Sequence, residues 1–385
     1  MGAWNTKKIK EIGLVITGKT PSLNNPEDWG DYYLFITPTD YKNYSKYASS
    51  SIRMLSKVGS DRLNNKCLPS NSVLVTCIGS DMGKVVINKK NAITNQQLNS
   101  IIPHAEIIDT DFLYYSLINN YELLRSYGAG GTAVPILNKT DFEEIEISLP
   151  PLATQKAIAE VLSSLDDKID LLHRQNKTLE QMAETLFRQW FVEEAGEDWE
   201  EGKLGDEFDF TMGASPPGTS YNEDKIGTPL FQGNADFGFR FPSNRVYTTE
   251  PKRFAKPHDT LISVRAPVGE QNMAKEECCI GRGVAAFRYK FNNNFYTYTY
   301  YKMKSLMDEI KQFNETGTVF GSISKSDFQN IDIVIPDEST IIYYQNLVKP
   351  IDDKIIINAK QIKTLIDLRD SLLPQLISGK ILTKI

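Results

Sequence analysis

The segment that decides the fold runs from Leu149 to Phe191 and reads LPPLATQKAIAEVLSSLDDKIDLLHRQNKTLEQMAETLFRQWF. Beyond Pro151 its apolar positions recur alternately four and three residues apart, and no Gly or Pro interrupts them. This heptad pattern predicts a continuous helix of about 38 residues, roughly 57 Å long. The seam of that helix is formed by Leu162, Leu165, Ile169, Leu172, Asn176 and Leu179.

A second segment with the same period lies near the C-terminus and is expected to end near Pro374. Its seam contains Ile351, Ile355, Asn358, Ile362 and Leu365. Either each helix packs on its own domain, or the two pack on each other. Because a lone buried amide costs roughly 1–3 kcal/mol, we expect an antiparallel coiled coil in which Asn176 meets Asn358. That register places Ile169 opposite Leu365, Leu172 opposite Ile362 and Leu179 opposite Ile355.

The chain repeats itself. GTAVPILNKTDFEEIEISLP (131–150) matches GTVFGSISKSDFQNIDIVIP (317–336) at eight of twenty positions, and the DDKI of 166–169 recurs at the same offset at 352–355. The two halves also begin alike, since Trp4 to Pro21 resembles Trp199 to Pro216. Short apolar runs bounded by Pro, Asn, Asp and Gly, such as 72–79 and 260–269, predict strands ahead of each helix. We therefore expect an α+β protein of two tandem mixed α/β domains related by an approximate two-fold axis.

Two globular domains on a pair of helices would offer a duplex two half-sites. The chain has a net charge of −6, yet residues 42–90 carry nine Lys/Arg and two Asp, and residues 240–304 carry twelve Lys/Arg and five acids. Basic residues would neutralise phosphates, while amides and Arg read base edges. Alternatively, these are ordinary solvated side chains. The candidate DNA contacts are Tyr41, Lys42, Tyr44, Lys46, Arg53, Lys57, Asn95, Gln96, Gln97, Arg240, Arg245, Arg253, Arg265 and Arg282.

Catalytic signatures are weak in this sequence. The nearest approach to an adenine methyltransferase loop, SPPG at 215–218, lacks the Asp or Asn and the aromatic residue. The GAGGT of 128–132 has no Lys-Ser/Thr after it and is no phosphate loop. A nuclease-like pattern at Pro336-Asp337 and Asp352-Asp353-Lys354 falls on the predicted helix, and its first-half copy has Pro151 in place of the first Asp. We therefore expect no catalytic residues and chemistry supplied by a partner.

Composition places the chain among ordinary globular proteins. Four Cys without a CxxC pair and three His make a metal site poorly supplied. The start MGAWNTKKIKEIG has no apolar signal-peptide core, and no apolar run reaches 18 residues. We expect a cytoplasmic protein.

The chain resembles the DNA-specificity subunit of Type I restriction-modification systems over nearly its whole length. The resemblance is carried by the stretch from Gly131 through 149–191, by its reduced copy from IVIPDES to LLPQLISGKI, by PLFQGNADFG at 229–238 and by GRG at 281–283. It implies two target-recognition domains, residues 1–150 and 196–336, and two spacer helices, residues 151–195 and 337–385. Each domain would read half of a bipartite DNA sequence.

The resemblance also implies partners. Two adenine-N6 methyltransferase subunits would bind S-adenosylmethionine and flip out the target base, and two ATP-dependent restriction/translocase subunits would join them. S-adenosylmethionine, Mg and ATP are thus expected on partner subunits and not on this chain. The expected methyltransferase-docking residues are Asp167, Lys168, Glu180, Phe187, Trp190, Asp353 and Lys354. The second half has Ile341 where Gln155 would fall, so the two docking sites would differ if Gln155 contacts a partner.

Two other functions remain open. A self-sufficient DNA methyltransferase or endonuclease would modify or cut DNA without a partner. A coiled-coil scaffold unrelated to DNA would show no salt-sensitive duplex binding.

Overall fold

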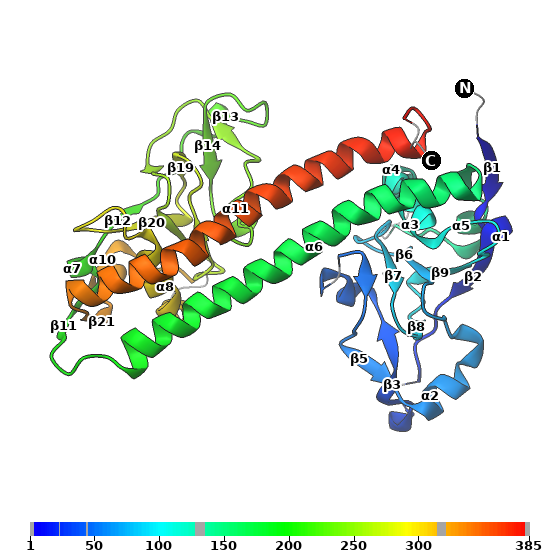
Figure 1. The fold of residues 1–385 in the computed structure, drawn as a ribbon, viewed down its shortest axis with the longest axis horizontal. Coiled ribbons are helices and arrows are strands. Elements are labelled where there is room, and N and C mark those ends of the chain that lie inside the picture. The colour runs from blue at the N-terminus through cyan, green and yellow to red at the C-terminus, as the bar shows by residue number, and fades with distance from the viewer. Residues whose placement is uncertain (1–3, 23, 44, 128–134, 314–320, 382–385) are drawn as a thin grey trace. The chain divides into compact units, whose positions relative to one another are not determined.

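The computed structural model describes residues 4–22, 24–43, 45–127, 135–313 and 321–381. The chain divides into two compact units, Met1–Leu171 with Lys363–Ile385, and Leu172–Ile362. The long helices α6 (Leu152–Arg188) and α11 (Glu338–Ile377) each contribute residues to both units (Figure 1). Each unit therefore consists of an α/β domain with one section of each long helix.

The described residues of the first unit form three sheets and, besides the long helices, five short α-helices. A five-stranded sheet has the order β2 (Gly13–Thr17), β9 (Leu98–Pro103), β6 (Val73–Thr76), β7 (Val85–Asn88) and β4 (Tyr47–Ala48). A three-stranded sheet has the order β5 (Arg53–Leu55), β3 (Trp29–Ile36) and β8 (Ala92–Thr94). β1 (Asn5–Lys8) pairs with β10 (Glu146–Leu149). The helices are α1 (Ile9–Ile12), α2 (Lys57–Arg62), α3 (Thr110–Asn119), α4 (Tyr121–Ser126) and α5 (Lys139–Glu143).

The second unit follows the same plan. A four-stranded sheet has the order β12 (Phe208–Met212), β20 (Val284–Tyr289), β17 (Thr260–Ser263) and β18 (Gln271–Met273). A five-stranded sheet has the order β13 (Tyr221–Asn222), β15 (Tyr247–Thr248), β14 (Thr228–Phe231), β19 (Cys278–Ile280) and β16 (Phe254–Ala255). β11 (Glu200–Lys203) pairs with β21 (Asp332–Ile335). The helices are α7 (Leu204–Glu207), α8 (Tyr296–Ser305), α9 (Met307–Gln312) and α10 (Lys325–Asn330).

The duplication predicted from the sequence is confirmed in the strand order. The antiparallel series β2-β9-β6-β7 of one unit has its counterpart in β12-β20-β17-β18 of the other. The parallel pair β3 and β8 likewise has its counterpart in β14 and β19. The first four residues of each sequence repeat, 131–134 and 317–320, lie outside the described residues.

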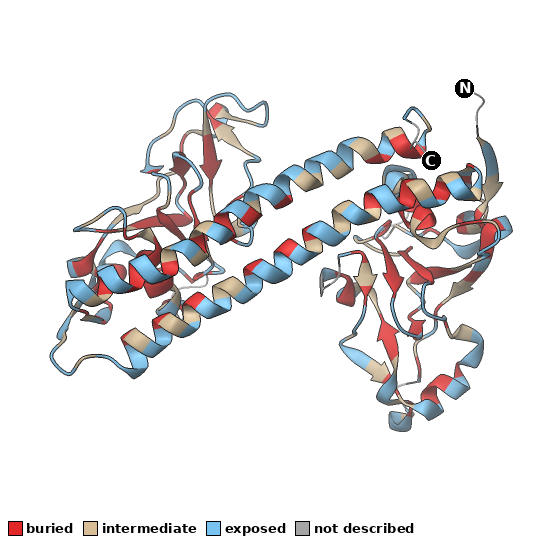
Figure 2. Cartoon of the chain, viewed as in Figure 1, coloured by how far each residue is buried: buried red, intermediate tan, exposed pale blue. Residues whose placement is uncertain are grey.

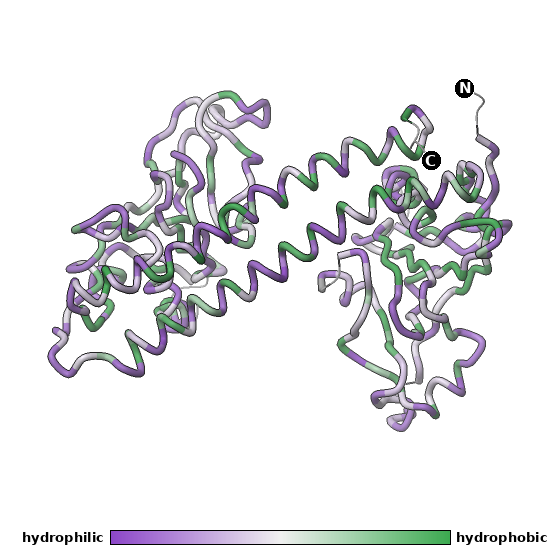
Figure 3. Tube along the Cα trace, in the orientation of Figure 1, coloured by the Kyte–Doolittle hydropathy of each residue, from purple (hydrophilic) through white to green (hydrophobic). Residues whose placement is uncertain are grey.

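Each long helix section is part of the core of its unit. In the first unit Ile158 and Leu162 of α6 and Leu373 of α11 pack with the α3 residue Phe112. In the second unit Phe187 of α6 and Tyr344 of α11 pack with the α8 residue Tyr298. Figures 2 and 3 show that the central strands β6 and β7 of the first unit are buried and hydrophobic. Among the described residues, no helix is long and apolar enough to cross a membrane.

The Asn pair predicted for the helix seam is present in the second unit. Nδ2 of Asn358 donates to Oδ1 of Asn176 at 2.9 Å, and both side chains are buried. In the π-helical turn Gln189–Glu193 that directly follows α6, Trp190 packs against Tyr344 with ring centroids 6.0 Å apart. Residue numbers therefore rise along one helix while they fall along the other, so the two sections are antiparallel. The alternative of two independent helices is excluded for this unit.

The remaining seam positions follow the predicted face. Leu162, Ile169, Leu172, Ile355 and Ile362 are buried. The half-buried seam positions are Leu165, Leu179, Ile351 and Leu365. α11 continues through Pro374 to Ile377 and so extends slightly beyond the predicted end.

Replacing Asn176 alone by leucine is expected to lower the free energy of unfolding by about 1–3 kcal/mol, because the buried amide of Asn358 loses its partner. The double change Asn176→Leu with Asn358→Leu should recover most of that loss, since both polar groups leave the seam together. Denaturant unfolding followed by circular dichroism measures both quantities. If the double variant loses as much stability as Asn176→Leu and Asn358→Leu lose separately when added together, the two amides do not interact.

Candidate nucleic-acid interface

The structure removes Arg240 from the predicted DNA contacts. Its guanidinium is completely buried, with Nη1 2.7 Å from Oδ1 of Asp352, which is also completely buried. The geometry of Nη1 and Oδ1 does not meet the criteria for a hydrogen bond, so the two side chains interact as an ion pair. Nη2 of Arg240 donates to the Tyr301 hydroxyl at 3.1 Å, and the guanidinium stacks over the Tyr300 ring at 3.8 Å. Arg240 therefore links the α/β domain of the second unit to α11, and its buried side chain cannot contact DNA.

The prediction that Lys46 and Tyr41 contact DNA is also wrong, because both side chains are buried in the first unit. Nζ of Lys46 lies 2.8 Å from Oδ1 of Asp111 and donates to the Ser163 hydroxyl of α6 at 2.7 Å. The Tyr41 hydroxyl donates to the Leu74 carbonyl at 3.0 Å. Lys46 thus joins its domain to α6.

The repeated Asp that opens each DDKI has the same structural task in both units. Asp166 accepts from the Tyr115 hydroxyl at 2.6 Å and from Nη1 of Arg369 at 2.8 Å. Asp352 accepts from the Thr297 hydroxyl at 3.1 Å in addition to its pairing with Arg240. Both carboxylates are therefore engaged within the protein, and Asp352 of the nuclease-like pattern is buried as part of the core of its unit. Among the described residues, no group of three or more His, Cys, Asp or Glu could hold a metal ion.

The other predicted contacts differ in exposure. Asn95 is buried and Gln97 is half-buried, whereas Tyr44 lies outside the described residues. The exposed ones are Lys42, Arg53, Lys57, Gln96, Arg245, Arg253, Arg265 and Arg282. These eight stay predictions as DNA contacts.

Three of the exposed cations already have neighbours in the protein. Arg53 stacks on Trp29 at 3.2 Å. Lys57 donates to Asp61 at 2.6 Å and Arg245 donates to Asp236 at 2.9 Å. These hydrogen bonds to carboxylates raise the pKa of Lys57 and of Arg245, so both side chains remain cationic.

Two loops present the candidate base readers. Asn95, Gln96 and Gln97 connect β8 to β9, and Asn95 and Gln97 hydrogen-bond each other through their side chains at 2.8 Å. Gln96 projects from this braced loop and accepts from the Thr20 hydroxyl at 2.8 Å. In the second unit the loop 281–283 connects β19 to β20, and Nε of Arg282 donates to the Ser215 hydroxyl at 3.3 Å. Each loop therefore holds one exposed polar side chain in a defined position.

The predicted docking residues are only partly on the surface. Asp167, Lys168 and Lys354 are exposed, and Asp353 is half-buried and accepts from Tyr296 at 3.0 Å. Trp190 is half-buried and stacks on Tyr343 with centroids 5.1 Å apart.

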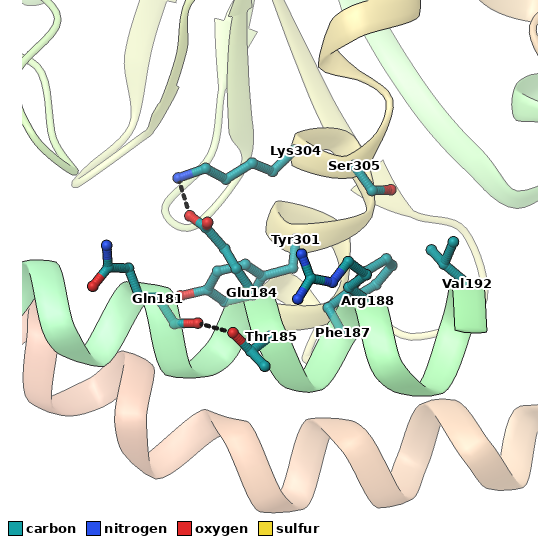
Figure 4. Close-up of a pocket in the computed structure, with 9 residues that line it drawn as sticks. All are labelled: Gln181, Glu184, Thr185, Phe187, Arg188, Val192, Tyr301, Lys304 and Ser305. Carbon is teal, nitrogen blue, oxygen red and sulfur yellow. Dashed lines mark hydrogen bonds and ion pairs between the residues drawn. The ribbon is translucent and has the colours of Figure 1, made fainter. Parts of the chain in front are cut away.

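Phe187 is wrong as a docking residue, because it is buried in the core against Phe191 and Tyr344. Glu180 is half-buried, lies 3.1 Å from Nζ of Lys304 and stays a prediction as a docking residue. A pocket of about 650 Å³ lies beside them between α6 and α8, where Lys304 also reaches Glu184 (Figure 4). The lining residues are Gln181, Glu184, Thr185, Phe187, Arg188, Val192, Tyr301, Lys304 and Ser305.

The helices expose apolar residues that the seam analysis did not find. Val161 and Leu171 are 37% and 39% exposed on α6, and Leu347 and Ile357 are 45% and 56% exposed on α11. Val161 aligns with Leu347, and Leu171 with Ile357, at the offset that relates the two DDKI segments. A search for apolar residues repeated outside the seam would have revealed them.

Gln155 is buried in the first unit, and its side chain is engaged within the protein. Its Oε1 accepts from the Asp109 backbone at 2.9 Å, and its Nε2 donates to the Pro150 carbonyl at 2.9 Å. In the second unit Gln345 of α11 accepts from the Tyr298 backbone at 3.1 Å, so it binds the first turn of α8 as Gln155 binds the residue that caps α3. The absence of Gln at position 341 is thus compensated one turn later and gives no reason for unequal docking sites.

Comparison with known proteins agrees with this architecture. The family model described as Type I restriction modification DNA specificity domain matches residues 1–181 and 196–367. The type I restriction enzyme MjaIX specificity subunit of Methanocaldococcus jannaschii is 29% identical over 98% of this chain and 93% of its own length. The HindI specificity subunit of Haemophilus influenzae is 38% identical over 38% of this chain and 32% of its own length.

A solved structure shares the fold. The crystal structure of a type I restriction-modification S subunit from M. genitalium has a TM-score of 0.62 and 19% identity, covering 99% of this chain and 96% of that one. Since the family model matches both halves and most of the chain, the protein belongs to the type I restriction-modification DNA specificity family, whose members supply recognition and not catalysis.

Proposed function

We propose that this chain binds a bipartite DNA sequence, with each unit reading one half-site, and recruits adenine-N6 methyltransferase and restriction/translocase subunits. The observation that carries the proposal is the presence of two copies of one DNA specificity domain with the same strand order in a single chain. Two equivalent folds with different surface loops suit two different half-sites. The long helices would act as the spacer that sets the number of unread base pairs.

The surface of the helices supports two equal docking sites for one kind of partner. We call Val161, Lys168 and Leu171 the α6 patch, and Leu347, Lys354 and Ile357 the α11 patch. In each patch the residues follow the spacing i, i+7 and i+10, which places them on one side of a helix. The repetition of the same exposed apolar positions on both helices favours a shared role in binding a partner. Because the patches are copies of each other, each would bind one methyltransferase subunit through the same contacts.

The chemistry would then belong to the partners. S-adenosylmethionine would bind to the methyltransferase subunits, and ATP and Mg would serve the restriction/translocase subunits. The cytoplasmic location expected from the sequence remains a prediction.

Mapping methylated adenines in DNA from cells that express this chain with its methyltransferase subunit tests the proposal. The expected result is a two-part motif with a fixed unread spacer. The purified chain alone should bind duplex DNA in a salt-sensitive manner and should neither methylate nor cleave it. Modification or cleavage by the isolated chain would favour a self-sufficient enzyme, and binding that ignores salt would favour a scaffold.

A further inference from the structure

The loops 95–97 and 281–283 occupy the same place in the duplicated fold. Each leaves a strand that pairs in parallel with its neighbour, β8 with β3 or β19 with β14, and each enters a central strand of an antiparallel sheet, β9 or β20. The offset that relates the two DDKI segments also relates Gln96 to Arg282. The two side chains are therefore positional equivalents, although their chemistry differs.

The backbone around the two loops is built in the same way. In the first unit, N–H groups of Gly18 and Lys19 donate to the carbonyls of Leu98 and Thr94 at 3.2 and 2.8 Å. In the second unit, those of Gly213 and Ala214 donate to Val284 and Ile280 at 2.9 and 3.0 Å. The residues that donate in the first unit align with those that donate in the second, and the residues that accept align in the same way. The segment after β2 or β12 is thus fastened to the loop by two equivalent hydrogen bonds.

Glycine permits this close approach. A Cβ atom at Gly18 would lie 2.2 Å from the Thr94 carbonyl oxygen, and one at Gly213 would lie 2.1 Å from the Gly281 carbonyl oxygen. Both distances are far below van der Waals contact, so a larger residue would push the two segments apart. Thr20 and Ser215, two residues beyond these glycines, are thereby placed beside the loops.

The hydroxyls of Thr20 and Ser215 orient the two exposed side chains. Thr20 donates to Oε1 of Gln96 at 2.8 Å. Ser215 accepts from Nε of Arg282 at 3.3 Å and donates to Oε1 of Gln232 at 2.8 Å. A hydroxyl can serve an amide as donor and a guanidinium as acceptor. Among the described residues, no hydrogen bond engages Nε2 of Gln96 or the terminal nitrogens of Arg282, so these groups face outward unused.

We propose that Gln96 and Arg282 are equivalent specificity-determining residues, with Gln96 reading an adenine in one half-site and Arg282 reading a guanine in the other. The inference rests on the proposed function. A Gln side chain matches N6 and N7 of adenine in the major groove, whereas the Arg fork matches O6 and N7 of guanine. One lone pair of Gln96 Oε1 is used by Thr20 and the other remains for the adenine amino group. Thr20 and Ser215 are positioning residues.

The decisive experiment exchanges the two side chains in the complex with the methyltransferase subunit and maps methylated adenines. Gln96→Arg is expected to change one base of one half-site from adenine to guanine. Arg282→Gln is expected to change one base of the other half-site from guanine to adenine. Each bidentate contact discriminates on the order of 10- to 100-fold, so the preference at that base should shift by that factor while the rest of the motif and the spacer stay the same.

Two further variants separate base reading from charge. Lys325→Gln removes one positive charge from an exposed position of the second unit outside the loop, and it should leave the motif unchanged. Ser215→Ala should relax the preference at the same base as Arg282→Ala, because Arg282 loses its orienting acceptor.

Three outcomes would count against the inference. First, a methylation motif that neither exchange alters would overturn the inference and leave the proposed function intact. Second, an equal loss of binding on all DNA sequences would also overturn it, because Gln96 and Arg282 would then be phosphate contacts. A shift at several bases at once would show that the loops act as wholes. Failure of the unmodified complex to give a two-part motif would instead refute the proposed function. Should an exchanged variant not fold, Gln96→Ala and Arg282→Ala measured on arrays of duplex sequences provide the same readout.

Discussion

Replacing Arg240 by methionine is expected to lower the free energy of unfolding of the second unit by about 3–5 kcal/mol. The side chain is completely buried, and its loss leaves Asp352, also completely buried, without a counter-charge. An unpaired buried carboxylate is penalised far more than the intact ion pair stabilises. Methionine keeps most of the volume, so the loss reports charge and not a cavity.

A double variant and a surface control complete this test. Arg240→Met with Asp352→Leu removes both charges and should recover a large part of the loss, because a buried pair is often replaceable by apolar groups. Arg253→Met, at an exposed Arg of the same unit, should change stability by no more than about 0.5 kcal/mol. Thermal unfolding of the three variants measures these differences. An Arg240→Met protein of unchanged stability that has lost DNA binding would restore Arg240 to the DNA-contacting surface.

The helix seam could be predicted from the sequence because the heptad spacing of apolar residues and the position of the polar ones both depend on which side of the helix is buried. A seam position must be apolar or have a polar partner, and Asn176 and Asn358 are the Asn residues of their two seams. Antiparallel packing then allowed one register, and the bond between the two amides is the one predicted. Here local pattern and tertiary contact depend on the same physical requirement.

The candidate DNA surface was harder to predict, since a count of charges along the chain does not distinguish buried cations from exposed ones. Lys46 and Arg240 lie in basic windows, yet their partners Asp111 and Asp352 are distant in sequence. A signal for Arg240 was present in the helix itself: Asp352 is a repeated acid beside an apolar seam, and such an acid requires a cation or hydroxyl when it is covered. Phe187 was misplaced because an aromatic residue on a helix fits an outer face or a core equally well by spacing alone.

Placing aspartate at both Leu347 and Ile357 is expected to abolish binding of one methyltransferase subunit, with at least a 100-fold loss of affinity at that site. If the α11 patch is covered by a partner, each aspartate would become a buried charge without a counter-ion, at a cost on the order of 2 kcal/mol or more. Two such costs exceed a factor of 100 in a dissociation constant. Since both side chains are exposed in the free chain, 45% and 56%, its stability should hardly change. Native mass spectrometry of the complex should then show one methyltransferase subunit per chain where the unmodified protein binds two.

The corresponding variant of the α6 patch, Val161→Asp with Leu171→Asp, makes this prediction more demanding. If the two patches are separate copies of one docking site, either variant should retain one methyltransferase subunit, and the combination of both should retain none. Ile226→Asp, at an apolar residue 59% exposed outside the helices, should retain two. Loss of both subunits from a single-patch variant would mean that the patches belong to one continuous interface, and retention of two subunits by every variant would place the docking site elsewhere on the chain. Because both patches have the same residue spacing, only the number of bound subunits, and not the affinity of either site alone, distinguishes two sites from one.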